Sequence, residues 1–248
     1  MPDKSKLIWV DAEYALSGDS LAIQNQKVRL IGIHAPKREQ KQKFSTPGEP
    51  LAKESQTFLN KLIANHNLKI AIYYDQTQRD HFNRQLVHAF FEDGSNLQQE
   101  MLKAGLAIYR PELSNEQFAK CYIQAEQQAR QGGYQLWDLL KKDPELHFPL
   151  IQSAQIYAED EGYRIVRGEV QTVKKSSDFY IINLDTTGIR IPERAWHRFD
   201  YADIQALKGK TIEVRGLIYH YKKAMYTVIE TPLAIDLLAK KELKRLKQ

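Results

Sequence analysis

The sequence predicts an α+β protein with two β-rich domains: a small five-stranded barrel with about three helices, followed by a second, mainly β barrel. Its first half orders its segments as strands, helix, strands, helix and helix, whereas residues 163–229 contain five short strand-like segments. The chain has 248 residues, of which 42% are hydrophobic. That length is enough for one large core or two small ones, and the change in composition favours two.

The first three strands are expected at residues 7–15, 20–24 and 27–33, the last two joined by a tight turn at Asn25 and Gln26. Residues 37–47 are polar and irregular, which predicts an exposed basic loop. Apolar residues then recur at helical spacing over residues 50–65. The domain therefore begins as a three-stranded meander followed by a helix.

A strand pair is expected at residues 69–74 and 85–91, closed by an Asp-Gly turn. Asn96 is suited to cap a short helix that ends before Gly105. Ser114 is suited to cap a longer helix over residues 114–131, which two glycines end. Cys121, the single cysteine, has the spacing of a buried helix face, and Trp137 is expected to pack against the first core.

Residues 138–155 show no sustained period and are interpreted as a linker between a first domain at 1–137 and a second at 156–236. Strands of the second domain are expected at residues 163–174, 178–185, 189–192, 211–219 and 225–229, with an irregular or helical insert at 193–207. Five strands with one such insert predict an OB-like barrel. Residues 237–248 are expected to form a basic tail.

The formal net charge of +5 is compatible with a polyanionic partner, although acids are interspersed with the basic residues. No apolar run approaches the length of a membrane span, so no membrane partner is expected. The first residues do not have the pattern of a secretory signal, so none is expected in this sequence. We expect either a cytoplasmic protein or the mature form of an exported one whose signal has been removed.

Chemistry concentrates in residues 28–37, VRLIGIHAPK, where a strand ends at a turn that carries Arg29, His34 and Lys37. Read with SGDS at residues 17–20, GEPLAKES at 48–55 and DHFNR at 80–84, it resembles the catalytic core of the staphylococcal nuclease-like (thermonuclease) family. The resemblance covers about residues 7–137, in the order of that family's motifs. It implies an OB-like barrel that binds single-stranded or frayed DNA or RNA, with calcium and two arginines around the scissile phosphate.

Carried over by position, the resemblance makes Arg29 and Arg84 the two phosphate-clamping arginines and Asp19 a calcium ligand. Asp80 matches the aspartate that precedes the second arginine. Planar guanidinium groups can hold phosphate oxygens in pairs and stabilise developing charge, which suits these roles. The alternative is structural: Asp80 and Arg84 form a local ion pair and Arg29 is a surface residue.

Three positions depart from the family pattern. Ser17 replaces an aspartate, His34 replaces a metal-binding aspartate, and Lys37 replaces the glutamate usually assigned as the base. Calcium requires several hard oxygens, so we expect it to bind at Asp19 weakly or not at all, with His34 and Asp80 nearby. Lys37 attracts phosphate but does not activate water, so the site becomes more cationic while hydrolysis is lost or weakened.

Other residues are candidates for the same chemistry. Glu39 is a possible substitute base, and His34 a possible metal-free base, although both are more simply read as surface or turn residues. Tyr109 matches an aromatic residue that lines the nucleotide pocket, with core packing as the alternative. In the second domain the substrate-binding candidates are Tyr219, Tyr221, Lys222 and Lys223, although hairpin ends are often rich in these residue types.

Three functions are therefore open. The first is a nucleic-acid-binding protein of nuclease descent with a degenerate active site. The second is an active DNA or RNA endonuclease, a phosphodiester hydrolase with a rearranged metal site. The third is a protein-interaction scaffold, whose partners the sequence does not name.

Overall fold

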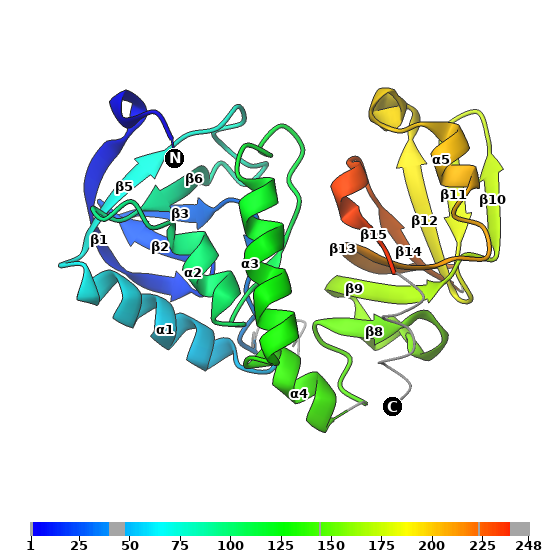
Figure 1. The fold of residues 1–248 in the computed structure, drawn as a ribbon, viewed down its shortest axis with the longest axis horizontal. Coiled ribbons are helices and arrows are strands. Elements are labelled where there is room, and N and C mark those ends of the chain that lie inside the picture. The colour runs from blue at the N-terminus through cyan, green and yellow to red at the C-terminus, as the bar shows by residue number, and fades with distance from the viewer. Residues whose placement is uncertain (1, 40–47, 144, 223, 239–248) are drawn as a thin grey trace. The chain divides into compact units, whose positions relative to one another are not determined.

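A computed structural model of the chain describes residues 2–39, 48–143, 145–222 and 224–238. It divides into two compact units, residues 1–144 and 145–248 (Figure 1). The predicted α+β class is confirmed: the first unit is a closed barrel with helices, and the second is mainly β. Over the described residues, no helix has both the length and the apolar character needed to cross a membrane.

The first unit is a closed five-stranded barrel in the order β1-β2-β3-β6-β5. Its strands are β1 (Ile8–Ser17), β2 (Ser20–Ile23), β3 (Gln26–Leu30), β5 (Lys69–Tyr73) and β6 (Gln85–Phe90). β3 and β6 run parallel, with Arg29 opposite Leu86, and the other neighbours are antiparallel. The barrel interior is apolar, and Leu21, Ile70 and Val87 are fully buried.

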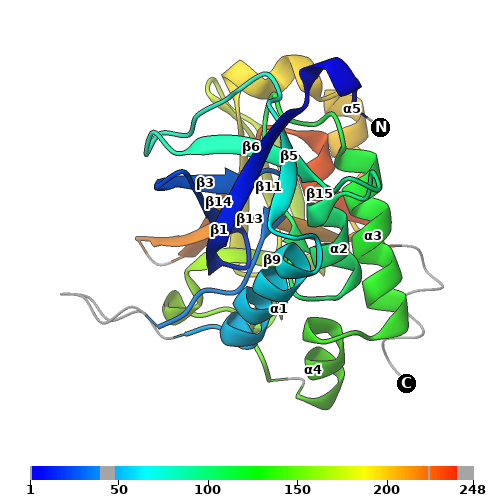
Figure 2. The same cartoon turned by 90° about the vertical axis from the view of Figure 1, so that its left-hand side faces the viewer.

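The described residues of this unit form four α-helices: α1 (Ala52–Asn65), α2 (Leu97–Lys103), α3 (Ala119–Gly132) and α4 (Leu136–Lys142). The first of them packs against β1, and α2 packs against α3 (Figure 2). A short pair, β4 (Ile33–His34) with β7 (Ile108–Tyr109), joins the end of the third barrel strand to the segment after α2. This antiparallel pair places Ile33 opposite Tyr109 and His34 opposite Ile108.

Two predicted element boundaries in this unit were wrong. The turn before β3 uses Gln24 and Asn25, both with positive φ, and Gln26 already lies in the strand. The third helix begins at Ala119 rather than at Ser114, whose φ is +69°. Tertiary contacts explain the delay: the Asn115 side chain bonds to the backbone of Thr77, and the Gln117 N–H donates to Asp75.

The buried face of α3 contains Tyr122, Ala125 and Ala129. Cys121 lies outside this face and is exposed, contrary to expectation. Trp137 is buried as expected, and the Arg130 guanidinium lies 4.3 Å from the centre of its ring. Asn96 caps α2 as expected, since its side chain accepts a hydrogen bond from the Gln99 N–H.

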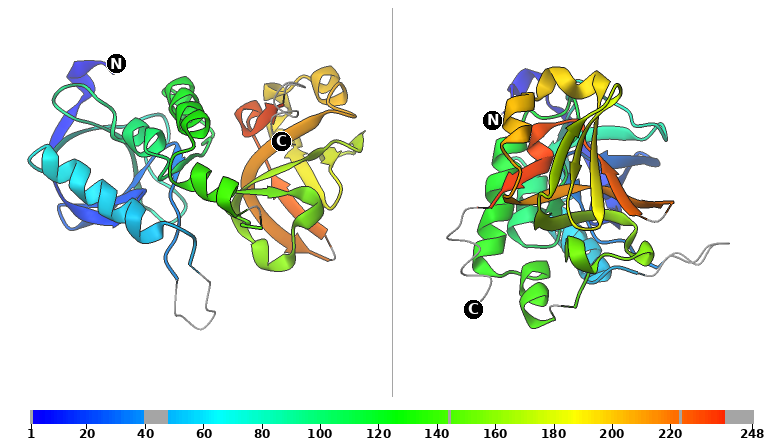
Figure 3. Two further views of the ribbon diagram at one scale, coloured as in Figure 1. Left: turned by 60° about the horizontal axis from the view of Figure 1, so that its bottom comes forward. Right: turned by 90° about the vertical axis from the view of Figure 1, so that its right-hand side faces the viewer.

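The second unit is an eight-stranded sheet in which β10, β11, β12, β14, β13, β9 and β8 are neighbours in that order, and β15 pairs with β13 (Figure 3). The strands are β8 (Leu150–Gln152), β9 (Gly162–Glu169), β10 (Thr172–Lys175), β11 (Phe179–Asn183), β12 (Thr187–Pro192), β13 (Thr211–Tyr221), β14 (Ala224–Val228) and β15 (Ile235–Leu237). The predicted insert forms a 3₁₀ helix, Glu193–Arg198, and α5 (Tyr201–Gln205).

The chain changes sheet neighbours between β9 and β10. The N–H of Val170 bonds to Lys210 beside β13, whereas the N–H of Gln171 bonds to Asn183 of β11. If β9 and β10 are counted as one bent strand, the strand order begins and ends with that strand, as it does in a closed barrel. The pair β12 and β14 is parallel, like the pair β3 and β6 of the first unit. Both units therefore follow the same OB-like strand order.

The segment expected as a linker is partly regular. Residues 138–142 complete α4, and Leu150–Gln152 form β8, which pairs in parallel with β9. The short apolar run at this strand was too brief to distinguish from a loop by period alone. Lys223, most of the predicted loop at 37–47 and most of the basic tail lie outside the described residues.

Candidate active site

Asp19 is the centre of the predicted site. It lies in the turn between β1 and β2, is fully buried, and accepts hydrogen bonds from several groups. The Ser17 hydroxyl donates at 2.7 Å and the Ala35 N–H at 3.1 Å. The turn between β1 and β2 and the segment after β4 thus meet at this carboxylate, although they are far apart in the sequence.

Lys37 forms the closest contact to Asp19. Its ammonium nitrogen lies 2.7 Å from Oδ1 and 2.6 Å from Oδ2, so one cation bridges both carboxylate oxygens. Burial alone would raise the pKa of Asp19, but Lys37 and Arg29 hold that pKa well below its usual value. Asp19 is therefore an ionised carboxylate that already has a cationic partner.

Arg29 projects from β3 and is only 4% exposed. One terminal nitrogen donates to Asp19 at 3.1 Å and the other to the Ile33 carbonyl at 3.0 Å. Its Nε lies 3.8 Å from a carboxylate oxygen of Glu112. In this conformation the guanidinium group is held by groups of the protein itself.

Asp80 and Arg84 form the second expected pair. Oδ1 of Asp80 accepts the N–H groups of Phe82 and Arg84, each at 2.9 Å, which folds residues 80–84 into a tight turn. Oδ2 lies 2.6 Å from both Nε and Nη2 of Arg84. The turn exposes 69% of Phe82, whose ring centre is 5.4 Å from the Arg84 guanidinium.

His34 lies on β4 and is 6% exposed. Its Nε2 is 3.9 Å from a carboxylate oxygen of Glu49, and the same oxygen accepts the Lys37 N–H at 2.8 Å. Burial and the charge of Lys37 hold the pKa of His34 well below its usual value. The imidazole is therefore neutral at neutral pH.

The other two candidates of the first unit, Glu39 and Tyr109, differ in their exposure. Glu39 is exposed at the last described position before the loop. Tyr109, on β7, is only 2% exposed, as the alternative of core packing expects. Its ring therefore presents no face on which a base could stack. In the second unit Tyr219 and Tyr221 are 37% and 56% exposed, and Lys222 is also exposed.

Glu49 and Glu112 are residues of this site that the sequence interpretation missed. Glu112 lies 3.7 Å from Nε of Arg110 as well as near Arg29. The only signal was an acid soon after the Tyr-Arg-Pro run, more than 80 residues from Arg29 in the sequence. These acids make the site less cationic than expected, because the expectation considered only the replacement of acids at positions 34 and 37.

Over the described residues, which exclude 40–47, the cations and carboxylates of the Asp19 cluster and of the Asp80–Arg84 pair are equal in number. Four cations (Arg29, Lys37, Arg84 and Arg110) face four carboxylates (Asp19, Glu49, Asp80 and Glu112). A phosphate would have to compete with carboxylates for these cations. The site is therefore less attractive to a polyanion than its lysines and arginines alone suggest.

These residues do not fit a calcium ion. Calcium takes six to eight oxygen ligands. Here the Asp19 carboxylate is bound by the Lys37 ammonium group, and His34, where the resemblance implies a second metal-binding aspartate, offers an imidazole. Over the same described residues, no cluster of three or more His, Cys, Asp or Glu side chains is arranged to hold a metal ion.

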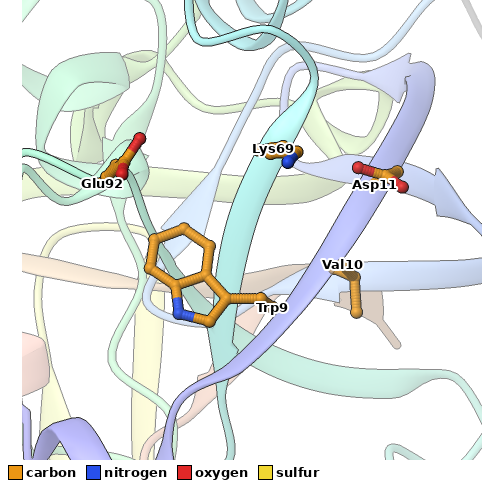
Figure 4. A pocket seen from close by; sticks show the side chains of 5 residues that line it. All are labelled: Trp9, Val10, Asp11, Lys69 and Glu92. Atoms are coloured by element: carbon orange, nitrogen blue, oxygen red, sulfur yellow. The ribbon is translucent and has the colours of Figure 1, made fainter.

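A pocket of the first unit lies away from these residues. Its volume is about 350 Å³, and it is lined by Trp9, Val10, Asp11, Lys69 and Glu92, on β1, β5 and the turn after β6 (Figure 4). None of these is a predicted site residue. The exposed Trp9 ring forms one wall, and none of the lining residues belongs to the Asp19 site.

Comparison with known proteins agrees with the barrel and the motifs. Residues 27–139 match the family model described as staphylococcal nuclease homologue. The search of curated proteins found no significant match to the chain. The matched range contains Arg29, Asp80 and Arg84 and three of the five barrel strands, β3, β5 and β6. The first unit of this chain therefore belongs to the staphylococcal nuclease-like family.

Proposed function

We propose that this protein binds single-stranded DNA or RNA and that its nuclease-like unit has lost phosphodiester hydrolysis or retains it only weakly. The contact between Lys37 and Asp19 carries the proposal. A nuclease of this family type requires a carboxylate free to bind a metal ion and a base that activates water. Here the carboxylate is neutralised by an ammonium group from the position where the base is expected.

Calcium binding is proposed to be weak or absent for the same reason. A divalent cation at Asp19 would have to displace the Lys37 ammonium and would lie beside the Arg29 guanidinium. Lys37 and Arg29 both lie within hydrogen-bond distance of Asp19, so they would repel a cation bound there. The repulsion is on the order of several kcal/mol at the effective dielectric constant near a protein surface.

Binding by the first unit is proposed to use its exposed groups. Phe82 offers a ring face, and the side chains of Arg84 and Lys37 are 25% and 38% exposed. A base stacked on Phe82 would place its phosphate beside Arg84. Because Arg84 is paired with Asp80, this contact contributes modestly.

The test combines a cleavage assay with a binding assay on the full chain. We expect no calcium-dependent cleavage of single-stranded or plasmid DNA, and salt-dependent binding of single-stranded oligonucleotides. Arg84→Ala should weaken binding several-fold, on the order of one phosphate contact. Lys103→Ala removes the same charge from an exposed pair on α2 and serves as the control. Robust cleavage that requires calcium and Arg84 would refute the loss of hydrolysis.

A second function has one supporting observation. His34 is neutral and lies 3.9 Å from Glu49, so it could accept a proton from water without a metal ion. This would make the protein a metal-independent phosphodiesterase. Cleavage that persists with a chelator and is abolished by His34→Gln would favour it over the binding function.

A further inference from the structure

The outward face of β12, β14 and β13 in the second unit combines aromatic rings with unneutralised cations. Residues along these strands alternate between the core and the surface. Ile189, Thr227 and Ile218 are buried, whereas Arg190, Val228 and Leu217 are at least partly exposed. Because the alternation has period two, the exposed residues share one face.

Strand register places these residues in two rows across the sheet. One row runs from Asn183 through Gly188 and Tyr226 to Tyr219. The other, two residues along, contains Lys174, Ile181, Arg190 and Val228. Directly paired residues point to the same side of a sheet, so five strands, β10, β11, β12, β14 and β13, contribute to one surface. Figure 3 shows these strands side by side.

Gly188 makes room for the central ring. A Cβ atom at this position would lie 2.7 Å from Cε1 of Tyr226, so the ring lies directly over the glycine backbone. The Arg190 guanidinium is 4.9 Å from the centre of the same ring. Tyr219 and Tyr221 lie 6.2 and 6.3 Å from Tyr226, between ring centres. The result is a group of three tyrosines beside an arginine.

The charge of this face differs from that of the Asp19 site. Among the described residues, Arg190 donates to the Asn183 side chain at 3.2 Å and to the Ile189 carbonyl at 3.1 Å, and no carboxylate pairs with it. Lys174 is exposed on the neighbouring row. Neither row contains an acid. A phosphate could therefore approach Arg190 without displacing a carboxylate.

We propose that this face stacks the bases of single-stranded nucleic acid on Tyr219, Tyr221 and Tyr226 and holds the phosphates with Arg190 and Lys174. The inference rests on the proposed function and adds that the second unit, not the Asp19 site, supplies most of the affinity. Stacking on tyrosine requires an exposed base face, which a duplex hides, and it reads no sequence. The ligand class is therefore unpaired DNA or RNA of any sequence.

The first experiment separates stacking from phosphate binding. Fluorescence anisotropy compares the full chain bound to oligodeoxythymidylate and to an abasic oligonucleotide of equal length. We expect the base-containing strand to bind more tightly, and Tyr221→Ala and Tyr219→Ala each to lower its affinity by about five- to 150-fold. Tyr221→Phe keeps the ring and should bind normally. Tyr157→Ala removes an equally exposed tyrosine of the same unit, 59% exposed, and is the control.

The second experiment tests the arginine. Arg190→Ala should weaken both oligonucleotides and reduce the salt dependence of binding, and by more than Arg84→Ala does. Arg194→Ala is the control, because Arg194 already pairs with Glu230. Circular dichroism and unfolding curves for each variant show whether it remains folded.

The outcomes separate this proposal from the function on which it rests. If the chain binds oligonucleotides but the tyrosine variants bind as well as wild type, this face is not the site, while nucleic-acid binding stands. If the abasic strand binds as tightly as the base-containing strand, stacking is refuted. If wild type binds neither strand, both proposals fail.

Discussion

The Lys37 ammonium bridges the two carboxylate oxygens of Asp19, at 2.7 and 2.6 Å, inside the barrel unit of a nuclease-like protein. The contact places an internal cation at a buried acid that would otherwise need an external one. It joins the turn after β1 to the segment after β4, so it contributes to the fold as well as to the chemistry. Its effects on stability, metal binding and pH response can each be measured.

Asp19→Asn should destabilise the first unit strongly. Removing the carboxylate leaves Arg29, which is 4% exposed, and Lys37 without their anionic partner, and breaking a buried pair in this way costs about 3–5 kcal/mol. Urea unfolding measures the loss. Asp11→Asn, at an exposed position of β1, is the control. The double variant Asp19→Asn/Lys37→Met should recover part of the loss, and equal losses in test and control would contradict the pairing.

Restoring the acids with His34→Asp and Lys37→Glu should create calcium binding. The change removes the competing ammonium and adds two hard carboxylates beside Asp19. Thermal unfolding with and without calcium reports it, because a ligand at about 100 times its Kd stabilises a fold by about 2.7 kcal/mol. Wild type should not shift. A calcium shift in wild type equal to that in the variant would show that Lys37 does not block the site.

Stability should fall as the pH drops below the usual pKa of histidine. Burial and Lys37 depress the folded-state pKa of His34, so between that value and about 6.5 the unfolded chain binds more protons and is favoured. His34→Gln should flatten the curve over this window. His88, whose pKa burial also lowers, should leave a residual slope. The exposed His81→Gln is the control, and an unchanged slope in His34→Gln would contradict the assignment.

Phe82→Ala should weaken oligonucleotide binding without destabilising the protein. The ring is 69% exposed, so its removal costs little packing, whereas loss of one stacked base costs about 1–3 kcal/mol of binding. Anisotropy and urea unfolding are measured on the same samples. Tyr14→Ala removes a 53% exposed ring from β1 and is the control. Equal affinity of both variants would exclude the 80–84 turn as a contact.

Gly32→Ala should destabilise the first unit through a clash with α3. Gly32 has a φ of +80°, and a Cβ there would lie 2.5 Å from the Tyr122 ring. Overpacking and backbone strain together should cost about 2–5 kcal/mol. Gly209→Ala has a φ of +74° with no atom within 4 Å, so it reports the backbone strain alone. If the two substitutions cost the same, the Tyr122 contact is unimportant.

Much of the fold was determined by local sequence. Alternation and turn residues predicted the five barrel strands, and Asn96 predicted the start of α2, because hydrophobic period and capping depend on near neighbours. The motifs at residues 28–37 and 80–84 predicted the family because each is formed by residues that are neighbours in the sequence. Prediction was wrong where distant groups compete with a local signal, as at Ser114, where bonds from Asn115 to Thr77 delay the helix.

Only the tertiary structure decided the electrostatics of the site. The sequence identified Asp19, Arg29 and Lys37, but not that Lys37 would bridge the Asp19 carboxylate or that Glu49 and Glu112 would join them. Charge pairing depends on distances between residues that are 10 to more than 80 positions apart, and no periodic pattern encodes such distances. Likewise, strand register set Arg190 beside Tyr226, because the parallel pairing of β12 with β14 joins residues that lie 38 positions apart in the chain.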